Sequence, residues 1–364
     1  MKKNETISNL QIKNLLITTV IGVGILALPN QMVTILDNDG WIPIIFGGLL
    51  VIPFAVMLDR VYKLYPDKNI YQIGREVYGK FIFNIFMIII LMYFVIQDAY
   101  VARIFAEVVK AYLLETTPIE VIIITILFIS AYLARCEIQV LGRVATLVYV
   151  ILITLVGFLV LISLPDADPT NMLPVFNADF KKLPSAITGA LFSYAGYEVV
   201  FIAYSSSDDK NNTLKYIIRG LLVVIGIYLI VFVITLSLFG IDQIKREIWP
   251  TIAIANEVDL PGYFLENLEG IILALWVVIV YSTLGPLLFA ASRIFLNIFT
   301  TKSHDFFVLL LIPIIYVISI LPVNVVEVYE KLGKVLNYFI AASIMGIPAI
   351  LFIGALVKKR RSKA

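Results

Sequence analysis

The sequence predicts an all-α integral membrane protein with about ten transmembrane helices, arranged as a 5+5 inverted repeat with discontinuous helices 1 and 6. The first observation is composition: 60% of the 364 residues are hydrophobic, 15% are charged and the mean hydropathy is +0.96, whereas an average soluble domain is nearer ~25% charged. The second is that most of the chain consists of apolar runs long enough to span hydrocarbon, which takes roughly 20 helical residues. The third is a pair of interrupted runs at matching positions.

The apolar runs place ten membrane-spanning helices and leave only short connections. The longest connection, residues 240–266, is too short to form an independent domain, so we expect one permease-like membrane domain over residues 1–364. Its first repeat covers about residues 10–163 and its second about 184–357. The predicted spans are residues 10–34, 41–58, 81–111, 119–135, 143–163, 184–204, 216–239, 267–292, 306–321 and 335–357.

The positive charges are divided unevenly between the two sides of the predicted bundle. With the N-terminus placed inside, nineteen Lys and Arg residues fall in inner segments and six in outer loops. This bias predicts that both termini are cytoplasmic and that the number of spans is even. The net charge of +2 favours neither nucleic acid nor an acidic partner. The basic tail, residues 358–363, is expected to contact membrane lipid headgroups.

Several kinds of chemistry are excluded by what the sequence lacks. Cys136 is the only cysteine, so no intramolecular disulfide can form. His304 is the only histidine, without partners for a metal site or a catalytic triad, and we interpret it as a solvated surface residue. The sequence has no P-loop. We therefore expect no enzyme, no cofactor and no metal. The first apolar run exceeds a signal-peptide core, so it should persist as helix 1.

Helices 1 and 6 are interrupted near mid-membrane depth. In helix 1, Gly22, Gly24 and Pro29 fall close together; an interior Gly costs ~1 kcal/mol relative to Ala, and Pro removes a backbone donor. Helix 6 reads Thr-Gly-Ala-Leu-Phe-Ser-Tyr-Ala-Gly-Tyr-Glu over residues 188–198. Counted from the start of each predicted span, Gly22 and Gly196 both lie about twelve residues in.

Interrupted helices at corresponding positions of inverted repeats indicate a substrate site at the bilayer midplane. Lipid cannot satisfy the freed backbone groups, so a break persists only where it lines a cavity or is covered by protein. Close helix packing on glycine is the alternative for one Gly-x-Gly, but the paired occurrence favours a cavity.

The direction of the two helices predicts what the cavity would bind. The outer half of helix 1 begins near Gly24 with free N–H groups and a positive dipole end, which suits a carboxylate. The outer half of helix 6 ends near Ser193 with free carbonyls, which suit an ammonium group. Glu198 could add a charge or be a site of proton coupling. A zwitterion such as an amino acid fits this pair of ends.

Polar residues in two other helices could face the same cavity. Gln97 and Asp98 lie in the outer half of helix 3, where a buried carboxylate indicates function; the alternative for Asp98 is a position in water at the outer interface. In helix 8, Thr283 and its neighbouring hydroxyls could supply oxygens to the cavity or to a sodium ion, or simply accompany a proline kink. Arg103 and Glu107 are one turn apart and are expected to pair.

Two connecting segments have predictable structure. Residues 69–80 read as a short amphipathic helix on the inner surface, capped by Asn69. Residues 240–266 mix charged and apolar residues around Pro250 and Pro261, and we expect them to form an ordered lid over the outer mouth of the cavity.

Several segments carry a family resemblance. They include residues 7–11, 21–29, 65–66, 78–80 and 194–198. The most distinctive is the stretch from Trp-Pro-Thr at 249–251 through Pro-Gly-Tyr-Phe-Leu-Glu-Asn-Leu-Glu-Gly at 261–270 to the tryptophan at 276. In these segments the chain resembles the B subunit of the spore germinant receptors of endospore-forming bacteria, a branch of the amino acid/polyamine/organocation superfamily. The resemblance runs nearly end to end.

The resemblance implies a permease fold that is used as a sensor. Such a B subunit binds a small nutrient, commonly an amino acid, and signals to companion A and C subunits in the spore inner membrane. Some transporting relatives place a lysine in helix 5 where a sodium ion would otherwise sit; helix 5 here has none, which favours the sensor. The site carried over by the resemblance comprises Gly22, Gly24, Ile25, Tyr194, Gly196, Tyr197 and Glu198.

Two functions are consistent with these expectations. The first is a germinant receptor subunit in which nutrient binding shifts the permease-like fold between conformations and so biases partner subunits. The second is a secondary active transporter for amino acids or amines. Uptake by the isolated chain would separate them.

Overall fold

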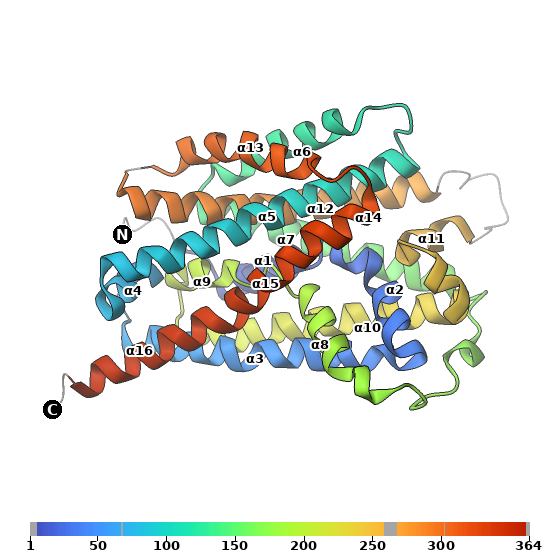
Figure 1. Cartoon of the computed structure of the whole chain (residues 1–364), viewed down its shortest axis with the longest axis horizontal. Helices are drawn as coiled ribbons and strands as arrows, with labels where there is room; N and C mark the ends of the chain where they lie inside the picture. Colours follow the sequence, from blue (N-terminus) through green and yellow to red (C-terminus); the bar gives the residue numbers. More distant parts are fainter. Residues whose placement is uncertain (1–5, 67, 258–267, 302, 362–364) are drawn as a thin grey trace.

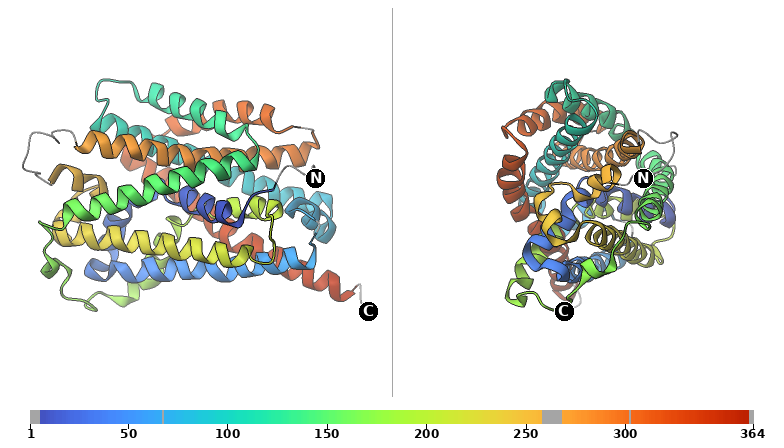
Figure 2. Two further views of the ribbon diagram at one scale, coloured as in Figure 1. Left: turned by 180° about the vertical axis from the view of Figure 1, so that it is seen from behind. Right: turned by 90° about the vertical axis from the view of Figure 1, so that its right-hand side faces the viewer.

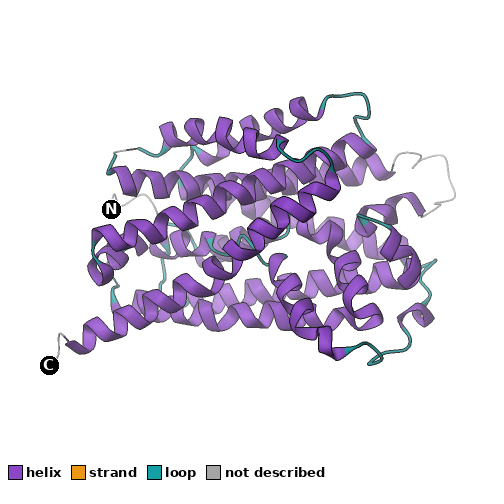
Figure 3. Cartoon of the chain, viewed as in Figure 1, coloured by secondary structure: helices purple, strands orange, loops and turns teal. Residues whose placement is uncertain are grey.

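The structure, a computed structural model, describes residues 6–66, 68–257, 268–301 and 303–361. Within these ranges every element is a helix (Figure 3), apart from an isolated bridge between Ile7 and Ser207. The long helices run side by side in an elongated bundle (Figure 1), and many large apolar side chains on its outside are exposed. In the described part of the chain, six helical stretches are long and apolar enough to cross a membrane. The chain is an all-α integral membrane protein, as predicted.

The predicted spans can be followed one by one in the described chain. Helix 1 is divided into α1 (Asn9–Val20) and α2 (Gly24–Leu36), and helix 6 into α8 (Leu183–Phe192) and α9 (Val199–Ala203). The uninterrupted spans are α3 (Trp41–Leu64), α5 (Lys80–Tyr112), α6 (Ile119–Ala134), α7 (Ile138–Ser163), α10 (Thr213–Arg246), α12 (Leu268–Phe299) and α13 (Asp305–Ile320). The last span joins α14 (Val325–Glu327), α15 (Gly333–Ala341) and α16 (Ile347–Arg361) through the π-helical turns η5 (Val328–Leu332) and η6 (Ala342–Gly346).

Short helices connect the spans. They are η1 (Asp37–Gly40), α4 (Ile70–Tyr78), η2 (Pro169–Met172), η3 (Phe180–Lys182), η4 (Tyr204–Ser206) and α11 (Pro250–Glu257). The predicted helix over residues 69–80 is confirmed as α4. It begins with the predicted cap, since the Asn69 side chain accepts the Gln72 amide at 2.9 Å and the Gln72 side chain accepts the Asn69 amide at 3.0 Å.

The two ends of the described chain lie at one end of the bundle (Figures 1 and 2). Near the N-terminus, the Ile7 amide donates to the Ser206 carbonyl at 2.8 Å, which ties the start of the chain to the end of helix 6. The shared end agrees with an even number of crossings. That this end faces the cytoplasm stays a prediction from the charge distribution.

The described part of the predicted lid is ordered. α10 bends at Gly240, whose φ of +64° favours glycine, and continues to Arg246. After a short turn α11 packs onto α2, where the Thr251 hydroxyl donates to the Ile25 carbonyl at 2.8 Å. The rest of the predicted lid, including Pro261, lies outside the described residues.

The prediction that His304 is a solvated surface residue is wrong. Its side chain is 2% exposed, its Nε2 atom lies 3.1 Å from the Ala134 carbonyl oxygen, and its ring packs edge-on against Phe289 at 5.2 Å. Burial, together with the positive charge of Arg293, lowers the pKa of His304. The side chain is buried because the short connection between α12 and α13 folds it back against the end of α6.

Candidate functional site

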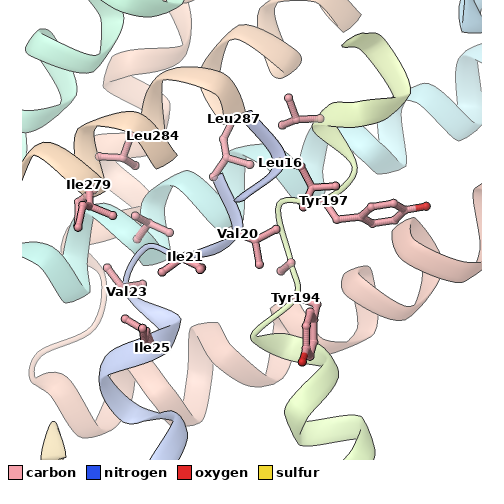
Figure 4. Packing of buried hydrophobic residues seen from close by; sticks show 14 of the residues in the cluster. Leu16, Val20, Ile21, Val23, Ile25, Tyr194, Tyr197, Ile279, Leu284 and Leu287 are labelled. Carbon is pink, nitrogen blue, oxygen red and sulfur yellow. The ribbon is translucent and has the colours of Figure 1, made fainter. Parts of the chain in front are cut away.

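The first break comprises residues 21–23, between α1 and α2. The Ile21 backbone turns out of the helix at φ −85° and ψ 81°, and in Figure 4 the ribbon is visibly unwound between Ile21 and Val23. Two side chains bind carbonyls at and just after the break. The Trp276 indole N–H donates to the Gly22 carbonyl at 3.3 Å, and the Thr251 hydroxyl donates to the Ile25 carbonyl, which has no helical partner because Pro29 has no N–H. The predicted interruption of helix 1 is therefore confirmed.

The start of α2 has unpaired amides. Val23 at the N-cap supplies no side-chain hydrogen bond, and the Gly24 and Ile25 amides donate to no described residue. Gly24 is partly exposed, whereas Val23 and Ile25 on either side of it are buried. A helix N-terminus with free N–H groups carries a partial positive charge. The first break thus presents an accessible, electropositive backbone inside the bundle.

The second break comprises residues 193–198, between α8 and α9, and it touches the first. Gly196 has a φ of +104°, a conformation that L side chains rarely adopt. A methyl group there would lie 3.0 Å from the Thr19 carbonyl oxygen of α1, and a methyl group on Gly24 would lie 3.6 Å from the Ser193 Cα atom. The two unwound segments pass side by side, as Figure 4 shows.

The prediction that the end of α8 presents free carbonyls is wrong. The carbonyls of residues 190–192 each accept the amide three residues further on, at 2.9–3.1 Å, and the Ser193 carbonyl accepts the Tyr228 hydroxyl at 2.6 Å. Tight turns follow α8 and satisfy these groups. What stays unpaired there is the Ser193 hydroxyl, which is buried without a described partner. A cation at this end could use that oxygen and the second lone pairs of the carbonyls.

Tyr228 of α10 joins the two breaks. Its hydroxyl oxygen lies 2.6 Å from the Ser193 carbonyl and 3.3 Å from the Val20 carbonyl. A hydroxyl has only one hydrogen, so the shorter contact is the main hydrogen bond. The ring is fully buried. A single side chain therefore fixes the end of α1 relative to the end of α8.

The Glu198 side chain folds back over the second break. Its Oε2 atom accepts the Gly196 amide at 2.8 Å and the hydroxyl of Tyr93, on α5, at 3.0 Å. Its other carboxylate oxygen is buried and has no partner among the described residues. The carboxylate thus stabilises the unwound backbone with one oxygen and leaves the other available.

Asp98 lies inside the bundle and not in water at its outer end. It is 1% exposed, and neither carboxylate oxygen has a hydrogen-bond partner in the described ranges; the side-chain oxygen of Gln97 is also unpartnered. Phe105, two turns further along the same face of α5, stacks on Trp276 of α12 at 5.5 Å. Asp98 therefore lies on the side of α5 that packs against α12.

The space beside the first break is small and apolar. A cavity of about 30 Å³ lies against Gly22, Ile25 and Trp276 and is otherwise lined mostly by apolar side chains of the break, α2, α7, α11 and α12. A cavity of this size holds a water molecule or two. A larger ligand at the breaks would require the helices around them to separate. A wider cavity of about 360 Å³ opens near the start of the α10–α11 connection, beside Asn30 and Tyr329.

Comparison with known proteins identifies the family. A family described as "Spore germination protein" matches residues 6–328. The chain belongs to this family. Among its relatives, spore germination protein YndE of Bacillus subtilis (strain 168) is 25% identical over 359 residues, 98% of each chain. Spore germination protein A2 of the same organism is 28% identical over 350 residues, 94% of this chain and 93% of the relative.

Solved structures show which fold this spore germination protein has. A Na+-coupled sialic acid symporter, solved in a substrate-bound outward-open state, superposes with a TM-score of 0.67 at 11% identity, over 94% of this chain and 79% of the symporter. MHP1, a nucleobase-cation-symport-1 family transporter in a closed conformation with bromovinylhydantoin bound, gives 0.70 at 13% identity, over 96% and 78%. At this identity the likeness concerns the fold alone, which is that of a transporter.

The structure brings most of the predicted site residues of this spore germination protein together. Gly22, Gly24 and Gly196 lie where the breaks meet, and Glu198 folds over the second break. Thr283 packs onto Gly22: a methyl group there would lie 2.6 Å from the Thr283 hydroxyl oxygen, which donates to the Thr18 carbonyl at 3.0 Å. Ile25 lines the small apolar cavity.

The two predicted tyrosines contribute backbone to the breaks, while their side chains point elsewhere. The Tyr194 hydroxyl donates to the Ile44 carbonyl of α3 at 2.7 Å. The Tyr197 ring packs edge-on against Phe201 at 5.4 Å, and its hydroxyl has no described partner. In Figure 4 the Tyr197 ring points away from the first break.

Sequence reasoning missed three side chains that hold the breaks. Tyr228 bridges the two breaks, Tyr93 supports Glu198, and Trp276 donates to the first break. A signal existed for Tyr228, because it is a tyrosine in the middle of the apolar run over residues 216–239.

Proposed function

We propose that this spore germination protein is a receptor subunit that binds a small zwitterionic nutrient, an amino acid, at the paired breaks. The observation that carries the proposal is the partly exposed amide end of α2 at Gly24, in contact with Ser193 of the second break. Binding then triggers germination together with partner subunits of the A and C type, in the spore inner membrane.

The ligand's two charged groups have distinct partners in this proposal. Its carboxylate binds the free amides of Gly24 and Ile25, where the helix dipole stabilises negative charge. Its ammonium group binds the Ser193 hydroxyl and neighbouring carbonyl oxygens of the second break, on the other side of the contact between Gly24 and Ser193. Asp98, buried without a partner, supplies a negative charge nearer α12 when the bundle opens. These assignments use the unpaired Ser193 hydroxyl and Asp98 carboxylate.

The nutrient signal arises from a change in helix packing. Since the cavity at the first break is about 30 Å³, binding of an amino acid selects a more open arrangement of the breaks. A ligand shifts such an equilibrium only to the extent that it binds one arrangement better. α11 moves with the first break because Thr251 is hydrogen-bonded to Ile25, and the change reaches the outer face that way.

Direct binding tests the proposal. The purified full chain in lipid nanodiscs is titrated with each of the twenty amino acids by isothermal titration calorimetry, alongside glycolic acid and methylamine, which each carry one of the two charged groups. The expected result is saturable binding of one or a few amino acids, with neither single-charge compound binding measurably. Binding of an amine alone, or of no amino acid in the presence of partner subunits, would refute it.

A secondary active transporter is the second candidate function, because the two solved structures with this fold are coupled transporters by their titles. The amino acid that binds is supplied in radiolabelled form to proteoliposomes with an imposed proton or sodium gradient. Gradient-driven accumulation by the isolated chain favours the transporter. Binding without accumulation favours the receptor.

A further inference from the structure

A polar cavity and a smaller, mainly apolar cavity lie on the side of the second break that faces the chain termini, away from the proposed nutrient contacts. The first has a volume of about 40 Å³ and is lined mainly by polar groups, among them Tyr71, Glu137 and Arg293. The second has a volume of about 20 Å³ and reaches Glu198. The two cavities share Ile70, Tyr71 and Ile202 in their walls, so they are adjacent, with Tyr71 between them.

Each end of this pair of cavities carries a buried polar atom without a partner. The Tyr71 hydroxyl, the Glu198 Oε1 atom and the Arg293 Nε atom are all buried with no hydrogen bond to a described residue. Buried polar groups are almost always hydrogen-bonded, and ordered water is the usual partner when protein is not. The polar cavity of about 40 Å³ has room for about two or three water molecules, and the cavity of about 20 Å³ has room for one, for which the Tyr71 hydroxyl and the Glu198 carboxylate are the polar partners.

We propose that these cavities form a water-filled proton path that runs from the end of the bundle where both termini lie to the Oε1 atom of Glu198. The carboxylate takes up a proton from a hydronium ion in the path, forming an O–H bond on Oε1 and leaving water, and it releases the proton by the reverse step. Tyr71 relays the hydrogen bond between the two cavities. The path goes beyond the nutrient site and does not depend on which nutrient binds.

Protonation of Glu198 changes the strength of the contacts that hold the second break. The Gly196 amide and the Tyr93 hydroxyl donate to Oε2, and hydrogen bonds to an ionised carboxylate are roughly twice as strong as those to a neutral one. A proton on Oε1 therefore loosens the unwound backbone at Gly196. The proton path links the pH on one side of the membrane to the packing of the breaks.

Few titratable or charged groups face Glu198 from the elements around it. From α5 these groups are Tyr93, which is hydrogen-bonded to Glu198, and Asp98 further along the helix. From the second break itself the group is Tyr197. On α4 it is Tyr71, and beyond Tyr71 on α12 it is Arg293. None of the ion pairs within the described ranges includes Glu198. In the described ranges, no cation in contact with Glu198 therefore stabilises its ionised form over its protonated form.

Infrared spectroscopy of the full chain in proteoliposomes tests the path. Difference spectra between pH values are searched for the C=O stretch of a protonated carboxylic acid. The expected result is a titrating band in the wild type that is missing in Glu198→Gln and shifted in Glu198→Asp. The band should respond to the pH on the side of the termini, which protease cleavage of the basic tail identifies.

The relay is tested by deuterium exchange at the same band. Tyr71→Phe is expected to slow the exchange about tenfold, as loss of one bridging hydrogen bond predicts, while the melting temperature stays unchanged because the hydroxyl has no partner among the described residues. Tyr338→Phe is the matched control, since that side chain is 82% exposed, and it should exchange like the wild type.

Three results would overturn the path: no titrating band assigned to Glu198, a band that follows only the pH opposite the termini, or unchanged exchange in Tyr71→Phe. None of these measurements uses a nutrient. A failure of amino acid binding therefore leaves the path standing, and a failure of the path leaves the nutrient site standing.

Discussion

Gly24 offers the sharpest test of the proposed nutrient site, because an added methyl group fits there without strain. It would meet the Ser193 Cα, Cβ and Oγ atoms at 3.6, 3.8 and 3.8 Å, which is ordinary van der Waals contact. Alanine is also the better helix former, by up to ~1 kcal/mol in a helix interior. Gly24→Ala should therefore leave the melting temperature unchanged or slightly higher.

The same methyl group stands in front of the amides that bind the ligand carboxylate in our proposal. Forcing one extra methyl group into a packed contact costs about 1–3 kcal/mol. If that cost falls only on the bound state, the dissociation constant rises roughly 5- to 150-fold. Gly24→Leu adds far more bulk and should abolish binding and the germination response of spores while protein abundance stays near normal.

The assay is calorimetric titration of purified wild type and variants with the amino acid that binds, together with dose–response curves of spores carrying the same variants. Gly157→Ala on α7 is the matched control, because a methyl group there meets nothing within 4 Å. If Gly24→Ala binds with wild-type affinity, or if Gly24→Leu spores respond normally, the nutrient does not bind at this contact and the reasoning fails.

Three further predictions concern stability. Tyr228→Phe leaves the buried Ser193 carbonyl unpaired, at a cost of about 1–3 kcal/mol, and should lower the melting temperature in detergent; an unchanged value would mean that the bridge is unimportant. Gly196→Ala forces a side chain into φ +104° beside the Thr19 carbonyl, at a cost of about 1–3 kcal/mol, and should reduce both melting temperature and abundance. The lowered pKa of His304 means that the unfolded state binds more protons below the ordinary value of 6.5, so wild-type stability should fall as pH decreases through that value. His304→Gln should flatten this acid limb when melting temperatures are compared over the pH range, and a parallel decrease would contradict the assignment.

Local features of the sequence were sufficient for much of the architecture. Long apolar runs fix the spans, and clustered Gly and Pro residues weaken helices wherever they occur, so both breaks were predictable at Gly22 and Gly196. The Asn69 cap depends only on the next turn of chain. The pair of Arg103 and Glu107, 2.9 Å apart in the structure, depends only on helical spacing.

Side-chain directions at the site were not predictable in this way. The prediction of free carbonyls after α8 failed because tight turns formed instead, and His304 is buried because it folds against α6. Whether Asp98 is buried or in water depended on which face of α5 packs against α12. Each of these outcomes involves residues far apart in the chain, about which a single sequence carries little information.

The sequence by itself determined that this chain crosses the membrane as helices, and that two of them are broken at matching depths, because hydrophobic length and backbone propensity are properties of the local chain. Only the tertiary structure decided how the breaks are held. Tyr228 bridges them, Glu198 caps the second break with one oxygen, and Tyr194 turns toward α3, because the rotation of each helix about its axis is set by packing against all its neighbours at once.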